Sequence, residues 1–227
     1  MRNDTIKGLV LTALFAAIII IMAYTPLGYI PLVVINATII HIPVILGSLF
    51  CGPKKGAFLG FIFGFTSFLK NTLTPTSLSA FVFSPVIAAG TVGISGVFKS
   101  AFICFVPRIL VGVLPYFIYK GIRKLGVCSK LNRVFALAVA GAAGAMTNTL
   151  LVMGGIYVLY KDAYAEAQKI EAEAVLGLIG GVISFNGVIE AALAAFLVAV
   201  IGLALLKVAP IEVSEKKEEE AGVKSAA

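Results

Sequence analysis

The chain has 227 residues, of which 60% are hydrophobic and only 13% are charged, and its mean hydropathy is +1.06. Soluble globular domains carry about 25% charged residues, so this composition predicts a protein embedded in a lipid bilayer. The net charge of +7 also suits nucleic-acid binding, but the basic residues separate apolar runs and form no patch with aromatic residues, which excludes that class.

Six apolar stretches follow one another along the chain. A helix needs about 20 mostly apolar residues to cross the hydrocarbon core of a bilayer. Stretches of about this kind occur at residues 7–24, 35–51, 55–71, 100–120, 133–159 and 184–207. We therefore predict an all-α integral membrane protein, with six transmembrane helices in one domain over residues 1–210. Residues 211–227 are rich in Glu and Lys, and we expect a disordered cytoplasmic tail there.

The basic residues between these stretches predict the orientation of the helices. Lys and Arg in short loops are retained in the cytoplasm. Lys54 and Lys55 separate the second stretch from the third, and several more basic residues separate the fourth from the fifth, whereas the loop at 25–34 has no charge. The pattern predicts a multi-pass protein of the cell membrane with both termini in the cytoplasm.

Polar side chains interrupt the predicted helices, mainly in the halves that face outward. Such groups are costly within a bilayer, so they face protein or water and mark function by default. Together they predict an outward-opening site for a small polar solute. The polar residues that we assign to this site are Asn36, Thr38, His41, Asn71, Arg108, Asn148, Asn186 and Glu190.

Each of these residues also has a purely structural interpretation. Asn148 could bond across helices, His41 could be a satisfied core histidine, and Glu190 could serve only to neutralise Arg108. Two classes of protein therefore stay open. One is a solute-binding transport subunit, and the other is a structural membrane protein whose polar residues lock its helices together.

Catalytic and metal-binding motifs are missing from the sequence. The chain has one histidine, no H-E-x-x-H, no G-x-S-x-G and no P-loop, and its three cysteines have no metal-ligand spacing. We predict no catalytic residues, no metal site and no enzymatic activity. Any ATP would be used by another chain.

The first helix carries a surface of small residues. Ala13, Ala16 and Ala17 are three or four positions apart, a spacing that allows close approach of another helix. We predict a partner-binding surface here, although packing within the chain would explain the same pattern.

The order of motifs resembles that of S components, the substrate-binding subunits of energy-coupling factor (ECF) vitamin transporters. The resemblance rests on GYIPL, HIPVILGSLFCGPKKGAFLG, FGFTSFLKN, FVFSP and VPRILVG, and HIPVI, GPKKGA and PRILVG are most like the pantothenate-type members. It implies a six-helix S-component bundle that captures a vitamin from outside. It also implies docking, through the alanine surface, on a membrane-embedded T component driven by two ATPase subunits, with no cofactor in this chain.

The resemblance also implies roles for residues in the site. The carboxylate of pantothenate would bind Arg108, its amide and hydroxyls would suit Asn, Thr and His side chains, and its gem-dimethyl group would suit Phe68, Phe81 or Phe83. We expect residues 72–99, which are broken by Pro75 and Pro85, to form a partly embedded cap over this pocket. An S component for another vitamin, such as riboflavin, is the alternative.

Overall fold

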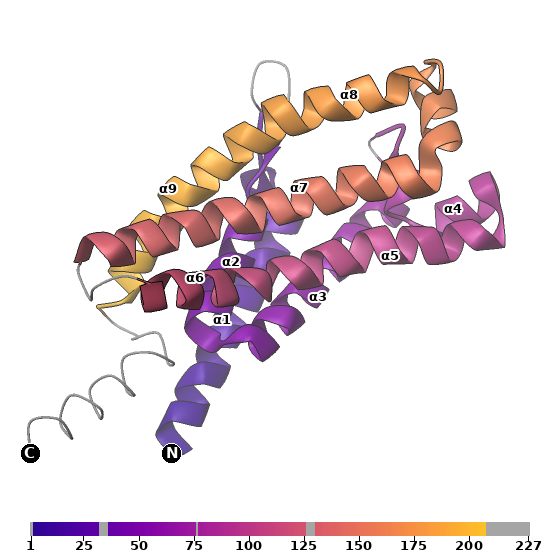
Figure 1. Ribbon diagram of the computed structural model, residues 1–227. Helices are drawn as coiled ribbons and strands as arrows, with labels where there is room; N and C mark the ends of the chain where they lie inside the picture. The colour runs from indigo at the N-terminus through magenta and orange to yellow at the C-terminus, as the bar shows by residue number, and fades with distance from the viewer. Residues whose placement is uncertain (1, 32–35, 76, 126–129, 208–227) are drawn as a thin grey trace, which may run out of the picture.

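The computed structural model describes residues 2–31, 36–75, 77–125 and 130–207, and helices dominate it (Figure 1). The elements in chain order are α1 (Arg2–Tyr24), a short 3-10 turn η1 (Pro26–Gly28), β1 (Tyr29–Pro31), β2 (Asn36–Thr38), α2 (His41–Cys51), α3 (Pro53–Leu73), the 3-10 turn η2 (Ala80–Val82), α4 (Pro85–Val92), α5 (Ile94–Val111), α6 (Leu114–Leu125), α7 (Lys130–Gln168), α8 (Ala174–Val182), the π-helical turn η3 (Ile183–Gly187) and α9 (Val188–Leu205). The predicted all-α class is confirmed apart from one small β pair. The predicted tail at 211–227 lies outside the described residues.

The prediction that a helix spans residues 35–51 is wrong at its start. Residues 36–38 form β2, which pairs antiparallel with β1 so that Thr38 lies opposite Tyr29, and α2 begins only at His41. Pro43 explains the difference, because a proline is tolerated in the first turn of a helix but removes a hydrogen bond and clashes deeper inside one. Asn36 and Thr38 therefore precede the helix instead of occupying its outer turns.

Three of the other predicted stretches extend well beyond their expected bounds. The stretch predicted at 100–120 is part of α5 and α6, which follow one another from Ile94 to Leu125. The stretch predicted at 133–159 continues in α7 to Gln168 with a kink at Tyr160, and the one predicted at 184–207 begins at Ala174. Within the described residues, four helical stretches are long and apolar enough to cross a membrane. They are Ile6–Tyr24, Ile94–Leu125, Leu131–Gln168 and Ala174–Leu205. With 11 residues, α2 rises only about 16 Å along its axis, less than the hydrocarbon thickness.

A row of glycines brings α3 and α5 into backbone contact. Gly56, Gly60 and Gly64 are four residues apart on α3, and a β-carbon at each would collide with a backbone carbonyl of α5, at Gly112, Arg108 and Cys104 respectively. Small residues at this spacing allow helix backbones to approach closely in membranes. The row runs forward on α3 and backward on α5, so the two helices are antiparallel and the backbone of Arg108 is fixed against Gly60.

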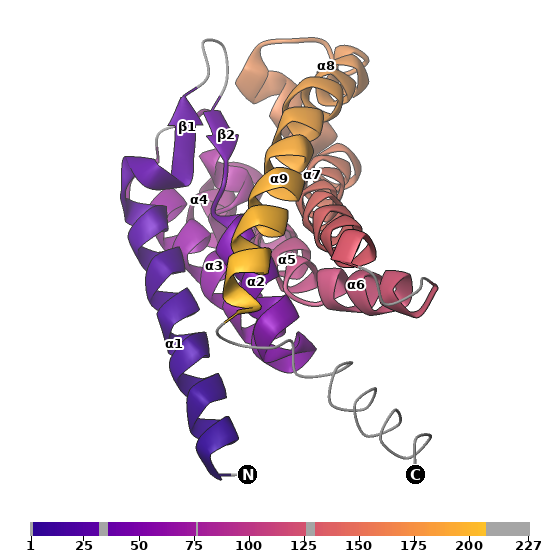
Figure 2. The same ribbon diagram turned by 90° about the vertical axis from the view of Figure 1, so that its left-hand side faces the viewer.

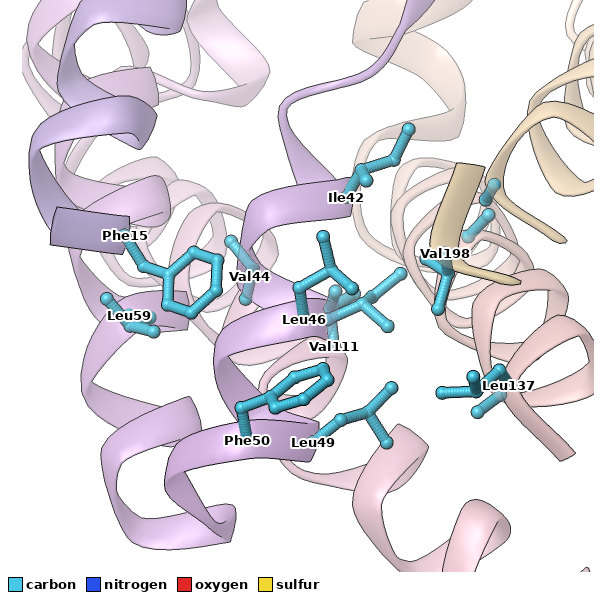
Figure 3. Close-up of a cluster of buried hydrophobic side chains, with 14 of the residues drawn as sticks. Phe15, Ile42, Val44, Leu46, Leu49, Phe50, Leu59, Val111, Leu137 and Val198 are labelled. Atoms are coloured by element: carbon cyan, nitrogen blue, oxygen red, sulfur yellow. The ribbon is translucent and has the colours of Figure 1, made fainter. Parts of the chain in front are cut away.

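Apolar side chains gather in two clusters. The larger, which we call the α2 cluster, surrounds α2, and Figure 3 shows α2 side chains between Phe15 and Leu59 on one side and Leu137 and Val198 on the other. The smaller, which we call the cap cluster, joins the turn Ala80–Val82 to α5, the second half of α7 and α8. The polar residues discussed next lie on elements that link these two clusters.

Candidate functional site

Glu190 ties three elements together. Its side chain is buried, and its carboxylate accepts a hydrogen bond from the backbone N–H of Thr38 (2.7 Å) and one from the Thr149 hydroxyl (3.4 Å). The strand β2 is thereby joined to α7 and α9. Glu190 thus accepts from two threonines, so the expectation that it exists only to neutralise Arg108 finds no support in its own contacts. Thr149 is the neighbour of Asn148 in the group of polar residues near the middle of the helix predicted at 133–159.

His41 and Asn148 carry buried polar atoms that lack partners. His41 is only 1% exposed, and among the described residues neither of its ring nitrogens has a hydrogen-bond partner. The side-chain oxygen of Asn148 on α7 is also buried and has no hydrogen-bond partner among the described residues. More than nine in ten buried polar groups in proteins are hydrogen-bonded, so two such residues together are unusual. The interpretation of His41 as a satisfied core histidine does not fit this environment.

Arg108 is held in a defined orientation by its surroundings. It is 6% exposed, one of its terminal nitrogens donates to the carbonyl of Ile103 (2.8 Å), and the guanidinium carbon lies 4.9 Å from the ring centre of Phe83 and 5.5 Å from that of Phe63. Cation–π contacts of this length are favourable, more so when desolvated. Phe63 was not assigned to the site from the sequence, although it belongs to the quoted FGFTSFLKN run.

Arg108 lies in the last turn of α5 and close to the middle of the Ile94–Leu125 stretch, just within its first half. The bond to Ile103 directs the guanidinium back toward the start of α5, the end that the prediction places outside.

The helix contacts place several of these groups at a common level. On α7, Gly155 faces Ile103 and Gly144 faces Ile45, while Tyr160 bonds Ser100, so α7 is antiparallel to both α5 and α2. His41 lies one turn before Ile45 on α2, and Asn148 lies one turn after Gly144 on α7. Because the two helices are antiparallel, both steps run in the same direction in space. Arg108 follows Ile103 by five residues and Asn148 precedes Gly155 by seven, so the two backbone positions differ by about 3 Å along the helix axis.

For the remaining predicted site residues, the structure gives local contacts or positions. The Asn71 amide donates to the carbonyl of Ser67 within α3, and the ring of Phe68 lies against Phe65, 6.2 Å between centres. Asn186 lies half-buried in the π-helical turn η3, four residues before Glu190, which is in the first turn of α9. Turns of this kind are often found at functional sites. For Asn36 the structure gives the backbone position in β2.

Hydrogen bonds fasten the segment predicted as a cap. The buried hydroxyl of Ser100 lies 2.7 Å from the carbonyl oxygen of Phe81 and 2.7 Å from the hydroxyl of Tyr160, which in turn lies 2.7 Å from the carbonyl oxygen of Gly96. The two hydroxyl hydrogens are shared among these three contacts. Thr72 and Ser84 share a further bond of 2.7 Å. The segment at 72–99 is thus an ordered structure of short helices rather than an open loop.

The alanines of α1 do not all face the same way. Ala13 and Ala17 are exposed, whereas Ala16 packs against the α2 cluster. A separate groove of about 290 Å³ is lined by residues of α1, α2 and α9. Figure 2 views the ribbon from the side on which α1 and α9 lie. The lining of the groove is wholly apolar and includes Phe15, Ile42 and Ile201. This groove therefore does not coincide with the polar site, and its chemistry does not suit a polar solute.

Taken together, the fold and the site define a multi-pass membrane protein with a buried polar level inside an apolar bundle. The sequence profile described as "ECF transporter, substrate-specific component" matches residues 7–202. The chain belongs to this family, and it is accordingly the substrate-specific subunit of an ECF transporter in the cell membrane and not an enzyme.

Two characterised relatives extend this assignment. The chain is 35% identical over 175 residues to the pantothenic acid transporter PanT of Lactococcus lactis subsp. cremoris. The aligned region covers 76% of this chain and 79% of that protein. It is 30% identical over 215 residues to the pantothenate transporter PanT of Leuconostoc mesenteroides subsp. mesenteroides. The aligned region covers 92% of this chain and 97% of that protein. The family resemblance expected from the motifs is confirmed.

Proposed function

We propose that this subunit captures pantothenate from the extracellular side of the membrane. The buried nitrogens of His41 and the buried oxygen of Asn148, which lack partners among the described residues, carry this proposal, because a bound polar solute would supply the missing hydrogen bonds. Both relatives are pantothenate transporters by name, which supports the choice of vitamin.

The chemistry of pantothenate matches the groups at this level. A guanidinium is a planar fork that grips a carboxylate through two parallel hydrogen bonds, and the rings of Phe63 and Phe83 fix the plane of Arg108. The amide and hydroxyl groups of the vitamin can pair with His41 and Asn148, and Phe83 offers an apolar surface for its methyl groups. Thr38, Phe68, Asn71, Asn186 and Glu190 complete the proposed lining, together with Asn36.

The proposed topology has six membrane crossings. They are formed by α1, α2 with its preceding hairpin, α3, α5 with α6, α7, and α8 with α9, in one domain over residues 1–210 with both termini in the cytoplasm. The basic residues support this orientation, since Lys54, Lys55, Lys120 and Lys124 all lie at one end of these elements. In this orientation α4 and the turn Ala80–Val82 cover the polar level from outside.

The family of the chain implies a T component and an ATPase module as partners. In the proposed assembly, Ala13 and Ala17 of α1 face the T component, with Ala16 supporting them from the core. Two ATPase subunits would bind and hydrolyse ATP, and this chain itself would need no cofactor.

A thermal-shift screen of the detergent-solubilised chain against the water-soluble vitamins tests the proposal. A ligand at 100-fold above its Kd adds about 2.7 kcal/mol to the free energy of unfolding. We expect pantothenate to raise the melting temperature and the other vitamins to leave it unchanged. A shift with riboflavin instead would assign a different vitamin, and no shift with any vitamin would favour a structural protein whose polar residues only lock helices.

A further inference from the structure

The second region of interest is the end of α6, the helix that follows the one with Arg108. In α6, Pro115, Tyr116, Tyr119 and Arg123 form one buried stripe, while Lys124 is exposed. Arg123 is 6% exposed, so an arginine occupies a core-facing position where an apolar residue is expected.

Retention of this loop in the cytoplasm does not require a buried arginine. Lys120 and Lys124 on the same helix already supply the positive charge that sets the orientation of a short loop. A buried guanidinium adds nothing to that signal, and it loses the hydration that an exposed one keeps. Its burial therefore calls for a separate explanation.

The guanidinium of Arg123 lacks partners of the kind it needs. Its Nε and one of its terminal nitrogens are buried, and among the described residues neither has a hydrogen-bond acceptor. The negative end of the α6 dipole lies nearby and favours a cation, but it supplies no acceptor to these two atoms. Nε and this terminal nitrogen, Nη1, lie on different edges of the guanidinium, so each needs an acceptor oxygen of its own, and anionic groups are the strongest acceptors for such donors.

Acidic side chains of the described residues are badly placed to provide that oxygen. Asp162 and Glu166 lie in the last turns of α7, whereas α6 directly precedes the start of α7, and Glu190 accepts from two threonines. Glu171 and Glu173 are exposed and lie between α7 and α8, beyond that same far end of α7.

We propose that Arg123 binds the phosphate of an anionic phospholipid at the cytoplasmic surface of the membrane. The side chains around the end of α6 suit such a lipid. Lys124 is exposed beside Arg123 for the headgroup, and Leu125 and Leu131 are 90% and 79% exposed, which suits acyl chains better than water. Basic pockets between membrane helices on the cytoplasmic side are known to bind anionic headgroups.

Lipid titration of the purified full-length chain tests this proposal. The probes are phosphatidylglycerol and phosphatidylcholine, added to the protein in neutral detergent, with the melting temperature and the number of lipids retained in native mass spectrometry as readouts. We expect phosphatidylglycerol to bind and raise the melting temperature and phosphatidylcholine to do neither. Arg123→Gln should raise the half-maximal phosphatidylglycerol concentration about tenfold or more, as expected for loss of a charge-assisted hydrogen bond.

Two variants act as controls for this experiment. Lys124→Gln removes one positive charge from the same helix at an exposed position, and it should leave most of the phosphatidylglycerol effect in place. Arg123→Lys keeps the charge but not the fork, so it should weaken binding and still yield folded protein if Arg123→Gln does not fold. Equal phosphatidylglycerol binding by the wild type and the folded Arg123 variants would overturn the proposal.

Two further arms identify the source of the anion. If inorganic phosphate alone reproduces the full shift in melting temperature, the site takes a free oxyanion and the lipid assignment is wrong. If the triple change Glu218→Gln, Glu219→Gln and Glu220→Gln lowers the melting temperature as Arg123→Gln does, and phosphatidylglycerol has no effect on either, the anion comes from the acidic tail. Dependence on phosphatidylglycerol and Arg123 together supports the lipid.

Discussion

The α2 cluster and the cap cluster are held together in different ways. Around α2, apolar side chains interlock and the glycines of α3 bring its backbone against α5. In the cap cluster, a few directional bonds through Ser100 and Tyr160 join the turn Ala80–Val82 to α5 and α7. Lipid tails are as apolar as the helices, so tight packing and hydrogen bonds hold a membrane bundle together.

This difference has a functional consequence. The α2 cluster is the larger of the two and its contacts are spread over many close-packed atoms, whereas the smaller cap cluster depends in part on a few hydrogen bonds and can open as a unit at lower free energy. The α2 cluster therefore suits the role of a rigid frame for Arg108, and the cap cluster suits the role of a cover. Four predictions test this comparison, from the largest expected effect to the smallest.

Gly60→Leu should have the largest effect, because it disrupts the close backbone packing of α3 against α5. A side chain at this position meets the backbone of Arg108 and Ile109, which cannot move aside as a flexible side chain would. We expect a loss of about 3 kcal/mol or more in the free energy of unfolding, the upper range for overpacking, measured by thermal melting in detergent. Gly177→Leu is the matched control, since a β-carbon at Gly177 meets open space. Similar melting of both variants would contradict the rigid-frame interpretation.

Arg108→Lys should affect ligand binding more than folding. The ammonium keeps the charge but cannot grip a carboxylate in the planar, two-bond manner of the guanidinium. We expect the Kd for pantothenate to rise about 10- to 150-fold, from the loss of one charge-assisted hydrogen bond. Calorimetric titration measures this change, and melting without ligand checks the fold. Wild-type affinity in the folded variant would remove Arg108 from the site.

Tyr160→Phe should loosen the cap cluster only. The change removes the bonds to Ser100 and Gly96 but keeps the ring that packs edge-on against Phe81, 5.5 Å between centres. We expect about 1 kcal/mol less stability and faster labelling of a cysteine introduced at Ser79. Pantothenate should slow that labelling in the wild type by ordering the cover. Labelling that responds to neither the mutation nor the vitamin would rule out an opening cover.

Ala17→Trp should leave the isolated chain almost unchanged. Ala17 is exposed on α1, so a large ring there meets no neighbour within the chain, and both melting and pantothenate affinity should stay near wild type. Assembly with the T component should be lost because the ring holds the two helices apart, and co-purification measures this. Ala16→Trp is the contrasting variant, since Ala16 packs on the core and its enlargement should lower the melting temperature. Intact assembly of Ala17→Trp would place the docking surface elsewhere.

The sequence by itself determined the class of the protein and most of its helices. Composition excluded a soluble domain, and the motif order was sufficient to indicate the family that the profile match establishes. Long apolar stretches are strong signals because lipid offers no hydrogen bonds to an exposed backbone, which leaves the helix as the natural form of each stretch. The start of α2 was within reach of sequence reasoning too, since Pro43 disfavours any helix that begins at residue 35.

Only the tertiary structure decided which polar groups meet and which stand alone. Periodicity shows which face of a helix a residue occupies, but not what lies opposite. The pairing of Glu190 with Thr38 spans 152 positions, and the backbone contact of Gly60 with Arg108 depends on the antiparallel course of α3 and α5. The sequence also did not predict the burial of Arg123, because it lies among other basic residues of the kind that set topology. Only the packing shows that it belongs to the buried stripe of α6.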